Sequence, residues 1–211
     1  MERQRWLDGT LYSPDFEQDS CGFGLIAQID NQPSHTLVQN AIGSLACMTH
    51  RGAIAADGLS GDGCGLLFKK PDAFLRAVAG ESGFMLGDLY AAGLLFLSRD
   101  AAPQAHARST LKAALEAQGL VVAGFRVVPT DSSVCGESAL ESEPHFEQIF
   151  VNAPAGMSED DFERKLYIGR RQAEKALEAS DPVFYLPTLS CRVISYKGLV
   201  MPDKLPVFYP D

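Results

Sequence analysis

Cys21 lies at the predicted start of a strand, a position that suits a reactive thiol better than a core residue. Cys21 follows a polar stretch and opens the run "CGFGLIAQID", which predicts a short apolar strand over residues 22–30. Cysteine is usually a small buried hydrophobe. At the boundary of a strand its thiol can be reached, and a reachable thiolate is a nucleophile. A packing role without chemistry is the alternative at this point.

A cysteine nucleophile needs a base that accepts the proton of its thiol, and two bases are open. One is a distant histidine, for which His50 is the candidate. The other is the α-amine of Cys21 itself, if residues 1–20 are removed, since such an amine has a reference pKa of about 7.7–8.0. The amine explains both the polar leader and the position of the cysteine, whereas the histidine explains neither.

The stretch "THRGAIAADGLSGDGCGLL" predicts a glycine-rich loop that turns into a strand. Its glycines lack the third position of a dinucleotide fingerprint, and no G-K-[ST] marks a phosphate-binding loop. Asp57 and Asp62 lack the acid spacing of a calcium loop. Arg51 is placed to be a cation at the end of a helix, which is its structural interpretation.

Composition excludes several classes of function. The 211 residues carry a formal net charge of -9, which argues against nucleic acid or an anionic membrane as a partner. No apolar run approaches the length of about 20 residues that spans a bilayer, and the N-terminus has no apolar signal segment. The 5 cysteines include no C-x-x-C pair, so neither a metal nor a cluster site is predicted, and free thiols in the cytoplasm fit best.

The remaining chain predicts alternating helices and paired strands, which is typical of an α+β layered domain. Helices are predicted over residues 34–50, 71–79 and 103–119 and from Ser158 onward. Further strands are predicted at residues 65–70, 89–98, 120–129 and 145–153 and around Pro187. Residues 130–143 are predicted to be a loop, and the chain to finish at residue 211 without a closing element.

Five segments in order resemble a known family. They are "DSCGFGLIAQI", "SHTLVQNAIGSLACMTHRGAIAADGLSGDGCGLL", "VPTDSSVCGESALESEPHFEQIFVN", "FERKLYIGRR" and "FYLPTLSCRVISYKGL". Together they resemble the N-terminal region of the glutamate synthase large subunit, which is a class II glutamine amidotransferase domain of the N-terminal nucleophile hydrolase type. The resemblance covers nearly the whole chain, and "CGFG", "HRGAIAAD" and "GDGCG" in this order are specific to glutamate synthase within the class.

The resemblance implies a fold, a processing event and a reaction. The fold would be an αββα four-layer sandwich, incomplete in this chain. Residues 1–20 would be a propeptide cut between Ser20 and Cys21, and residues 21–211 the N-terminal part of the amidotransferase domain. Cys21 would attack the side-chain amide of L-glutamine, with its freed amine moving the proton and with ammonia leaving from a glutamyl thioester. Arg51 would support the N-terminal amine.

The same resemblance implies partners outside these residues. Ammonia would travel to a synthase site in the remaining domains of the parent subunit, where FMN and an iron–sulfur cluster supply electrons. Those electrons would come from a small reductase subunit or from ferredoxin. No cofactor and no metal are expected within this chain itself.

Two departures from the family pattern lower the activity expected of this chain alone. The family's H-S-R-F-S-T segment, whose arginine holds the glutamine carboxylate, and its H-N-G-E-I segment, which forms the oxyanion hole, are both missing from residues 1–211. Oxyanion donors supply much of transition-state stabilisation. We therefore expect the isolated chain to turn glutamine over weakly or not at all. The alternative is an inert module with an uncut leader that serves assembly or regulation.

Overall fold

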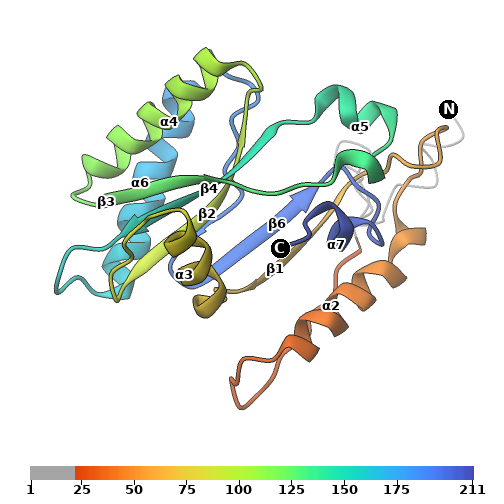
Figure 1. Ribbon diagram of the computed structural model, residues 1–211, viewed down its shortest axis with the longest axis horizontal. Helices are drawn as coiled ribbons and strands as arrows, with labels where there is room; N and C mark the ends of the chain where they lie inside the picture. Colours follow the sequence, from red (N-terminus) through yellow and green to blue (C-terminus); the bar gives the residue numbers. More distant parts are fainter. Residues whose placement is uncertain (1–21) are drawn as a thin grey trace, which may run out of the picture.

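The structure is a computed structural model that describes residues 22–211, so Cys21 lies outside the described residues (Figure 1). Within this range the chain forms two antiparallel sheets. One has four strands in the order β3-β4-β2-β5, and the other pairs β1 with β6. The predicted mixture of helices and paired strands is therefore confirmed.

The four-stranded sheet is built around two central strands that are buried on both faces. β2 (Tyr90–Leu97) and β4 (His145–Asn152) pair along their whole length, from Tyr90 opposite Asn152 to Leu97 opposite His145. β3 (Val121–Val127) and β5 (Leu189–Ser190) lie at the two edges. Both faces of β2 and β4 are covered, and β2 is accordingly a continuous apolar run, whereas β4 also buries Glu147 and Gln148.

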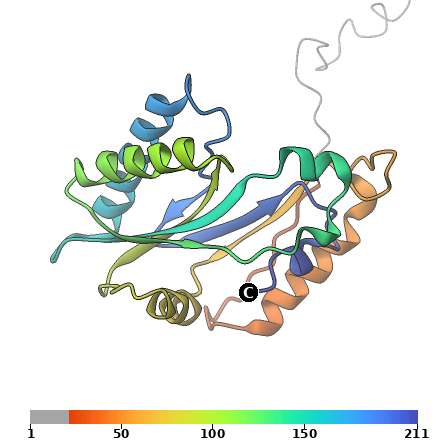
Figure 2. The same cartoon turned by 45° about the horizontal axis from the view of Figure 1, so that its top comes forward.

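Two long helices cover one face of this sheet. α4 (Ala101–Glu116) and α6 (Glu159–Leu177) lie on the same side of it in Figure 2. α6 starts as predicted, because the Ser158 hydroxyl accepts a hydrogen bond from the Asp161 amide at 3.2 Å. The helix then buries a stripe spaced at three and four residues, made of Phe162, Leu166, Gly169, Ala173 and Leu177.

The second sheet covers the opposite face. β1 (Cys64–Lys69) and β6 (Val193–Gly198) pair from Cys64 opposite Gly198 to Lys69 opposite Val193. Side chains of the two sheets and of α3 (Asp72–Glu81) share one apolar cluster, to which Tyr90, Phe150 and Ile194 contribute fully buried side chains. The sheets therefore face each other across a core, with α2 and α3 on the side away from α4 and α6 (Figure 2).

The remaining helices and turns of the described residues connect these layers. They are α2 (His35–Cys47), the 3-10 turns η1 (Thr49–Arg51) and η2 (Ser132–Val134), α5 (Glu137–Ser142) and α7 (Leu205–Phe208). None of the helices within residues 22–211 combines the length and the apolar character that crossing a membrane requires.

Three sequence predictions are wrong. Residues 22–30 form no strand, because no other described strand pairs with their backbone, and Phe23 and Ile29 are almost fully exposed. The predicted loop at residues 130–143 contains η2 and α5, which are too short to show helical periodicity. The chain also has a last ordered element, since α7 buries Leu205 and Phe208.

Candidate active site

Arg51 packs against the residue that follows Cys21. A Cβ atom placed on Gly22 would lie 3.5 Å from the Arg51 Cβ and 3.5 Å from the Met48 Sδ. Gly22 is far from Arg51 in the sequence, so this contact is made by the fold. It places Arg51 next to Gly22, whereas Cys21 itself lies outside the described residues.

Helix α2 is the element that carries Arg51 to this position. The Ser34 hydroxyl caps the helix by accepting a hydrogen bond from the Leu37 amide at 3.2 Å, as predicted. Leu45, near the end of the helix, is buried in the core between the sheets. η1 follows at once and ends in Arg51, where the predicted helix-end cation stands.

The structure gives His50 no comparable place. His50 lies on the same turn η1 and, like Arg51, is exposed. The three atoms nearest to a Cβ at Gly22 belong to Arg51 and Met48. Among these two residues, Arg51 is therefore the neighbour of Gly22.

The loop after Arg51 is a closed hairpin. The Asp62 carboxylate accepts a hydrogen bond from the Ala53 amide at 2.8 Å, and Ile54 forms a bridge with Gly61. Gly63 has a φ of +90°, which a side chain would strain, and β1 begins at the next residue. The predicted turn into a strand is therefore confirmed.

Asp57 holds the tip of this hairpin. Its carboxylate accepts hydrogen bonds from the amides of Leu59 at 2.9 Å and Ser60 at 2.8 Å, and from the Ser60 hydroxyl at 2.6 Å. These donors, with the Ser60 hydroxyl foremost, lower the pKa of Asp57 to about 2. The carboxylate is thus fully engaged by protein donors, which is a structural use of an acid that might otherwise suggest a metal. Among the described residues, no group of three or more His, Cys, Asp or Glu side chains could hold a metal ion.

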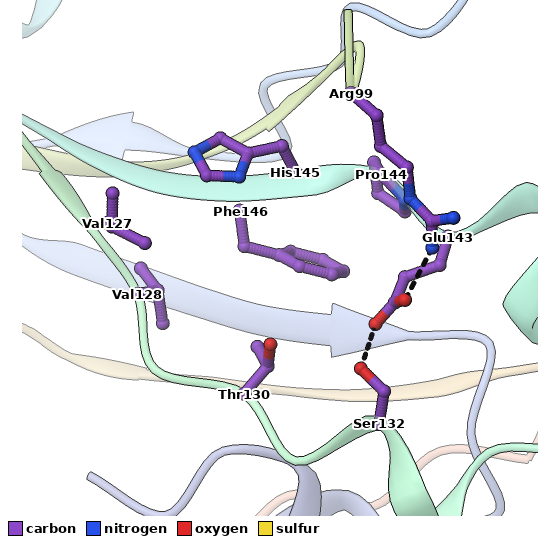
Figure 3. A pocket seen from close by; sticks show the side chains of 9 residues that line it. All are labelled: Arg99, Val127, Val128, Thr130, Ser132, Glu143, Pro144, His145 and Phe146. Carbon is purple, nitrogen blue, oxygen red and sulfur yellow. Dashed lines mark hydrogen bonds and ion pairs between the residues drawn. The ribbon is translucent and has the colours of Figure 1, made fainter.

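A surface pocket lies elsewhere, near the start of β4 (Figure 3). Its charged groups are already paired, since Glu143 accepts from Arg99 at 2.5 Å and also from the Ser132 hydroxyl. Neither Gly22 nor Arg51 lines this pocket. We therefore do not assign the predicted chemistry to it.

Beside this pocket, the sheet buries an acid that sequence reasoning missed. Glu147 on β4 is 1% exposed and forms a two-point ion pair with Arg108 of α4, in which Arg108 Nε donates to Glu147 Oε2 at 2.8 Å. His145 Nε2 lies 3.1 Å from Glu147 Oε1. A polar pair, "EQ", inside the apolar run "HFEQIFVN" was the available signal. The contacts identify a structural ion pair beneath α4.

A comparison with known protein families identifies the class of this protein. The family described as "Glutamine amidotransferases class-II" matches residues 21–211, so the chain belongs to the class II glutamine amidotransferases. The match begins at Cys21, the predicted nucleophile.

The chain is also similar to curated proteins that are named as glutamate synthases. The chain is 36% identical over 202 residues to "Glutamate synthase [NADPH] large chain" of Bacillus subtilis, covering 95% of this chain and 13% of that protein. It is 39% identical over 197 residues to "Ferredoxin-dependent glutamate synthase 2" of Synechocystis sp., covering 92% and 12%. It is 38% identical over 203 residues to "Glutamate synthase [NADPH] large chain" of Azospirillum brasilense, covering 95% and 13%. The chain spans about an eighth of the length of these relatives.

Proposed function

We propose that this chain releases ammonia from L-glutamine for a glutamate synthase. The observation that carries the proposal is the family match, which starts at Cys21 and covers the remainder of the chain. The packing of Arg51 against Gly22 supports it, because the side-chain stem of Arg51 then lies next to the residue that follows Cys21. Family membership over this whole length favours an enzyme over the inert module.

The proposed reaction uses Cys21 twice. Removal of residues 1–20 frees the α-amine of Cys21, whose reference pKa of about 7.7–8.0 suits a base at neutral pH. The thiol sulfur attacks the amide carbon of glutamine while the thiol proton passes to the α-amine. The amine then gives that proton to the leaving nitrogen, so ammonia departs and a glutamyl thioester remains. Water attacks the thioester, which restores the thiol and releases glutamate.

We further propose a four-layer αββα arrangement for the domain. Helices α4 and α6 supply one outer layer, the two sheets supply the inner layers, and α2 lies on the opposite outer side. The burial of both faces of β2 and β4 supports the first three of these layers.

The parent protein would use the ammonia outside this chain. We propose a synthase domain with FMN and an iron–sulfur cluster as the acceptor site, reached through the remaining length of a glutamate synthase. One relative is named for NADPH and another for ferredoxin, so both a small reductase subunit and ferredoxin are compatible with this similarity. A cytoplasmic location agrees with the free thiols of Cys47, Cys64, Cys135 and Cys191.

Intact mass spectrometry tests this proposal. We expect the purified protein to begin at Cys21. In keeping with the weak turnover expected of this chain alone, only a minor fraction should gain the mass of one glutamyl group when the protein is quenched in acid after mixing with glutamine. The Cys21→Ala variant should lose that adduct, whereas Cys47→Ala, which removes an exposed thiol, should keep it. A protein that retains residues 1–20 and never forms the adduct would refute the proposed function.

A further inference from the structure

Strand β3 is an outer strand of the four-stranded sheet, and its outer side is open. Its inner side pairs with β4, from Val121 opposite Asn152 to Val127 opposite Glu147. Within residues 22–211 no strand lies beyond it, and the strand at the opposite edge, β5, is only 2 residues long. β3 is therefore the long open edge of this sheet.

The hydrogen-bond pattern identifies the peptide groups of β3 that point outward. Val128, which directly follows β3, donates its amide N–H to the opposed Phe146 carbonyl at 3.0 Å. In an antiparallel ladder such hydrogen-bonded pairs alternate with pairs whose N–H and C=O groups point away from each other. The register is regular from Gly124 to Val127, so the peptide groups of Phe125 and Val127 point to the open side.

These outward groups have no partner within the described part of the chain. No hydrogen bond between residues 22–211 engages the main-chain N–H or C=O of Phe125 or Val127. Val127 is 59% exposed, and Val121 at the other end of the strand is 55% exposed. An edge with free peptide groups is a template for another strand. It therefore fits an extended backbone as its partner.

β3 has few of the features that keep natural edge strands from pairing. Its sequence, VVAGFRV, contains no proline, lysine or acid. A register shift between Val122 and Gly124 disturbs the first half of the strand, but the second half is regular. The single charged residue is Arg126, which donates to Gln148 Oε1 at 2.7 Å and forms an ion pair with Asp211. Its charge is thus already compensated within the chain.

We propose that the open edge of β3 pairs with the same edge of a second copy of this chain, so that the two four-stranded sheets join into one. A two-fold axis relates the copies and makes the two strands antiparallel. An axis at Arg126 sets Phe125 of each copy opposite Val127 of the other. This register joins the outward N–H and C=O groups of both residues in two hydrogen-bonded pairs.

A second copy is the favoured partner because this edge is complementary to itself. In the proposed register the exposed Val127 lies beside an aromatic ring, that of Phe125, and such cross-strand pairs stabilise sheets. The two Arg126 side chains oppose each other, but each keeps its Asp211 carboxylate, so no uncompensated charges meet. The net charge of -9 on each chain opposes association at longer range, so salt should strengthen the dimer.

Sedimentation velocity on the 211-residue chain measures this association. One strand pair is smaller than a standard interface of about 1,200–2,000 Å², so we expect a weak dimer with a Kd of about 10–100 µM. Samples from about 5 to 500 µM bracket that range. Raising the salt from about 0.05 to 0.5 M should lower the Kd.

Two variants test the edge in different ways. Val127→Lys places a charge on the open side, and Val127→Pro removes the outward N–H without adding a charge. Each change acts twice in a symmetric dimer, so each should raise the Kd about tenfold or more. The matched control is Leu67→Lys, which places the same charge on β1 at a leucine that is 64% exposed. Circular dichroism checks folding, and if Val127→Pro does not fold, Val127→Lys decides.

Hydrogen exchange, followed residue by residue by NMR, locates the contact. In dilute solution the amides of Phe125 and Val127 should exchange faster than that of Val128, which is bonded to Phe146. Above the Kd the amides of Phe125 and Val127 should become protected, because the second copy then accepts their hydrogen bonds.

Three results would overturn the proposal. They are a chain that stays monomeric up to about 500 µM, a Kd that folded Val127→Lys leaves unchanged, and an equal weakening by Leu67→Lys. The last two would place the contact elsewhere on the surface. None of these measurements involves Cys21 or glutamine, so the dimer and the proposed glutamine hydrolysis stand or fail separately.

Discussion

Removing Arg108 should destabilise the protein by leaving a carboxylate buried without its main partner. In the native structure the side chain of Glu147 is 2% exposed and that of Arg108 is 33% exposed. Loss of one partner from a fully buried ion pair costs about 3–5 kcal/mol. Because Arg108 is partly exposed and His145 still contacts Glu147, we expect about 2–3 kcal/mol for Arg108→Met.

Urea denaturation measures this cost, and thermal unfolding provides a second reading. For a chain of this size, each kcal/mol lowers Tm by about 2–4 °C, so Arg108→Met should lower it by about 4–12 °C. The matched control is Arg164→Met, which removes an arginine paired with Asp161 on the solvent side of α6, where the two side chains are 65% and 55% exposed. That change should cost less than about 0.5 kcal/mol.

A second substitution at the same site isolates the cause. If the cost comes from an uncompensated charge, Glu147→Gln added to Arg108→Met should restore part of the lost stability. Equal losses for Arg108→Met and Arg164→Met would refute this reasoning. A double variant whose loss of stability exceeds the sum of the losses in the two single variants would refute it as well.

Three further predictions follow from burial and pKa. Leu166→Ala, in the stripe of α6, should cost about 2–5 kcal/mol in urea denaturation, and a cost below about 1 kcal/mol would contradict the packing. The pKa of Asp57 is about 2 in the folded protein and lies below its ordinary value of 3.8, so its contribution to stability is present above about pH 4 and is lost as the pH falls toward 2. Asp57→Asn should therefore flatten the acid limb of the stability–pH curve, and an unchanged limb would contradict this. Burial raises the pKa of the Cys191 thiol to about 12, so under native conditions at pH 8 a thiol reagent should modify exposed Cys47 much faster than Cys191.

Periodic and capped elements were predictable from the sequence. Ser158 with Asp161 marked the start of α6, and Phe162 and Leu166 gave its buried stripe, because cap and stripe are local properties of consecutive residues. The strand predicted at residues 22–30 is absent because strand formation depends on residues that are distant in the sequence. A strand needs a partner, and apolar residues alone do not supply one.

Only part of the candidate site was predictable from the sequence, because the rest depends on contacts between distant residues. Residue type and position pointed to Cys21, and the family resemblance pointed to Arg51. The contact between Arg51 and Gly22 depends on the return of the chain through α2. Glu147 could not be assigned a role, because its partner Arg108 is contributed by α4. Partners that are far apart in the sequence produce no recognisable spacing pattern.

Asp57 and Asp62 have one interpretation in the sequence and another in the structure. In the sequence, Asp57 and Asp62 among glycines raise the question of a cation site. In the structure, amide and hydroxyl donors of the protein engage both carboxylates, so each acid fixes a piece of backbone. Gly136 then has to be a glycine because the loop occupies the space of its side chain. Both acids therefore serve to fix the backbone of the loop between Arg51 and β1.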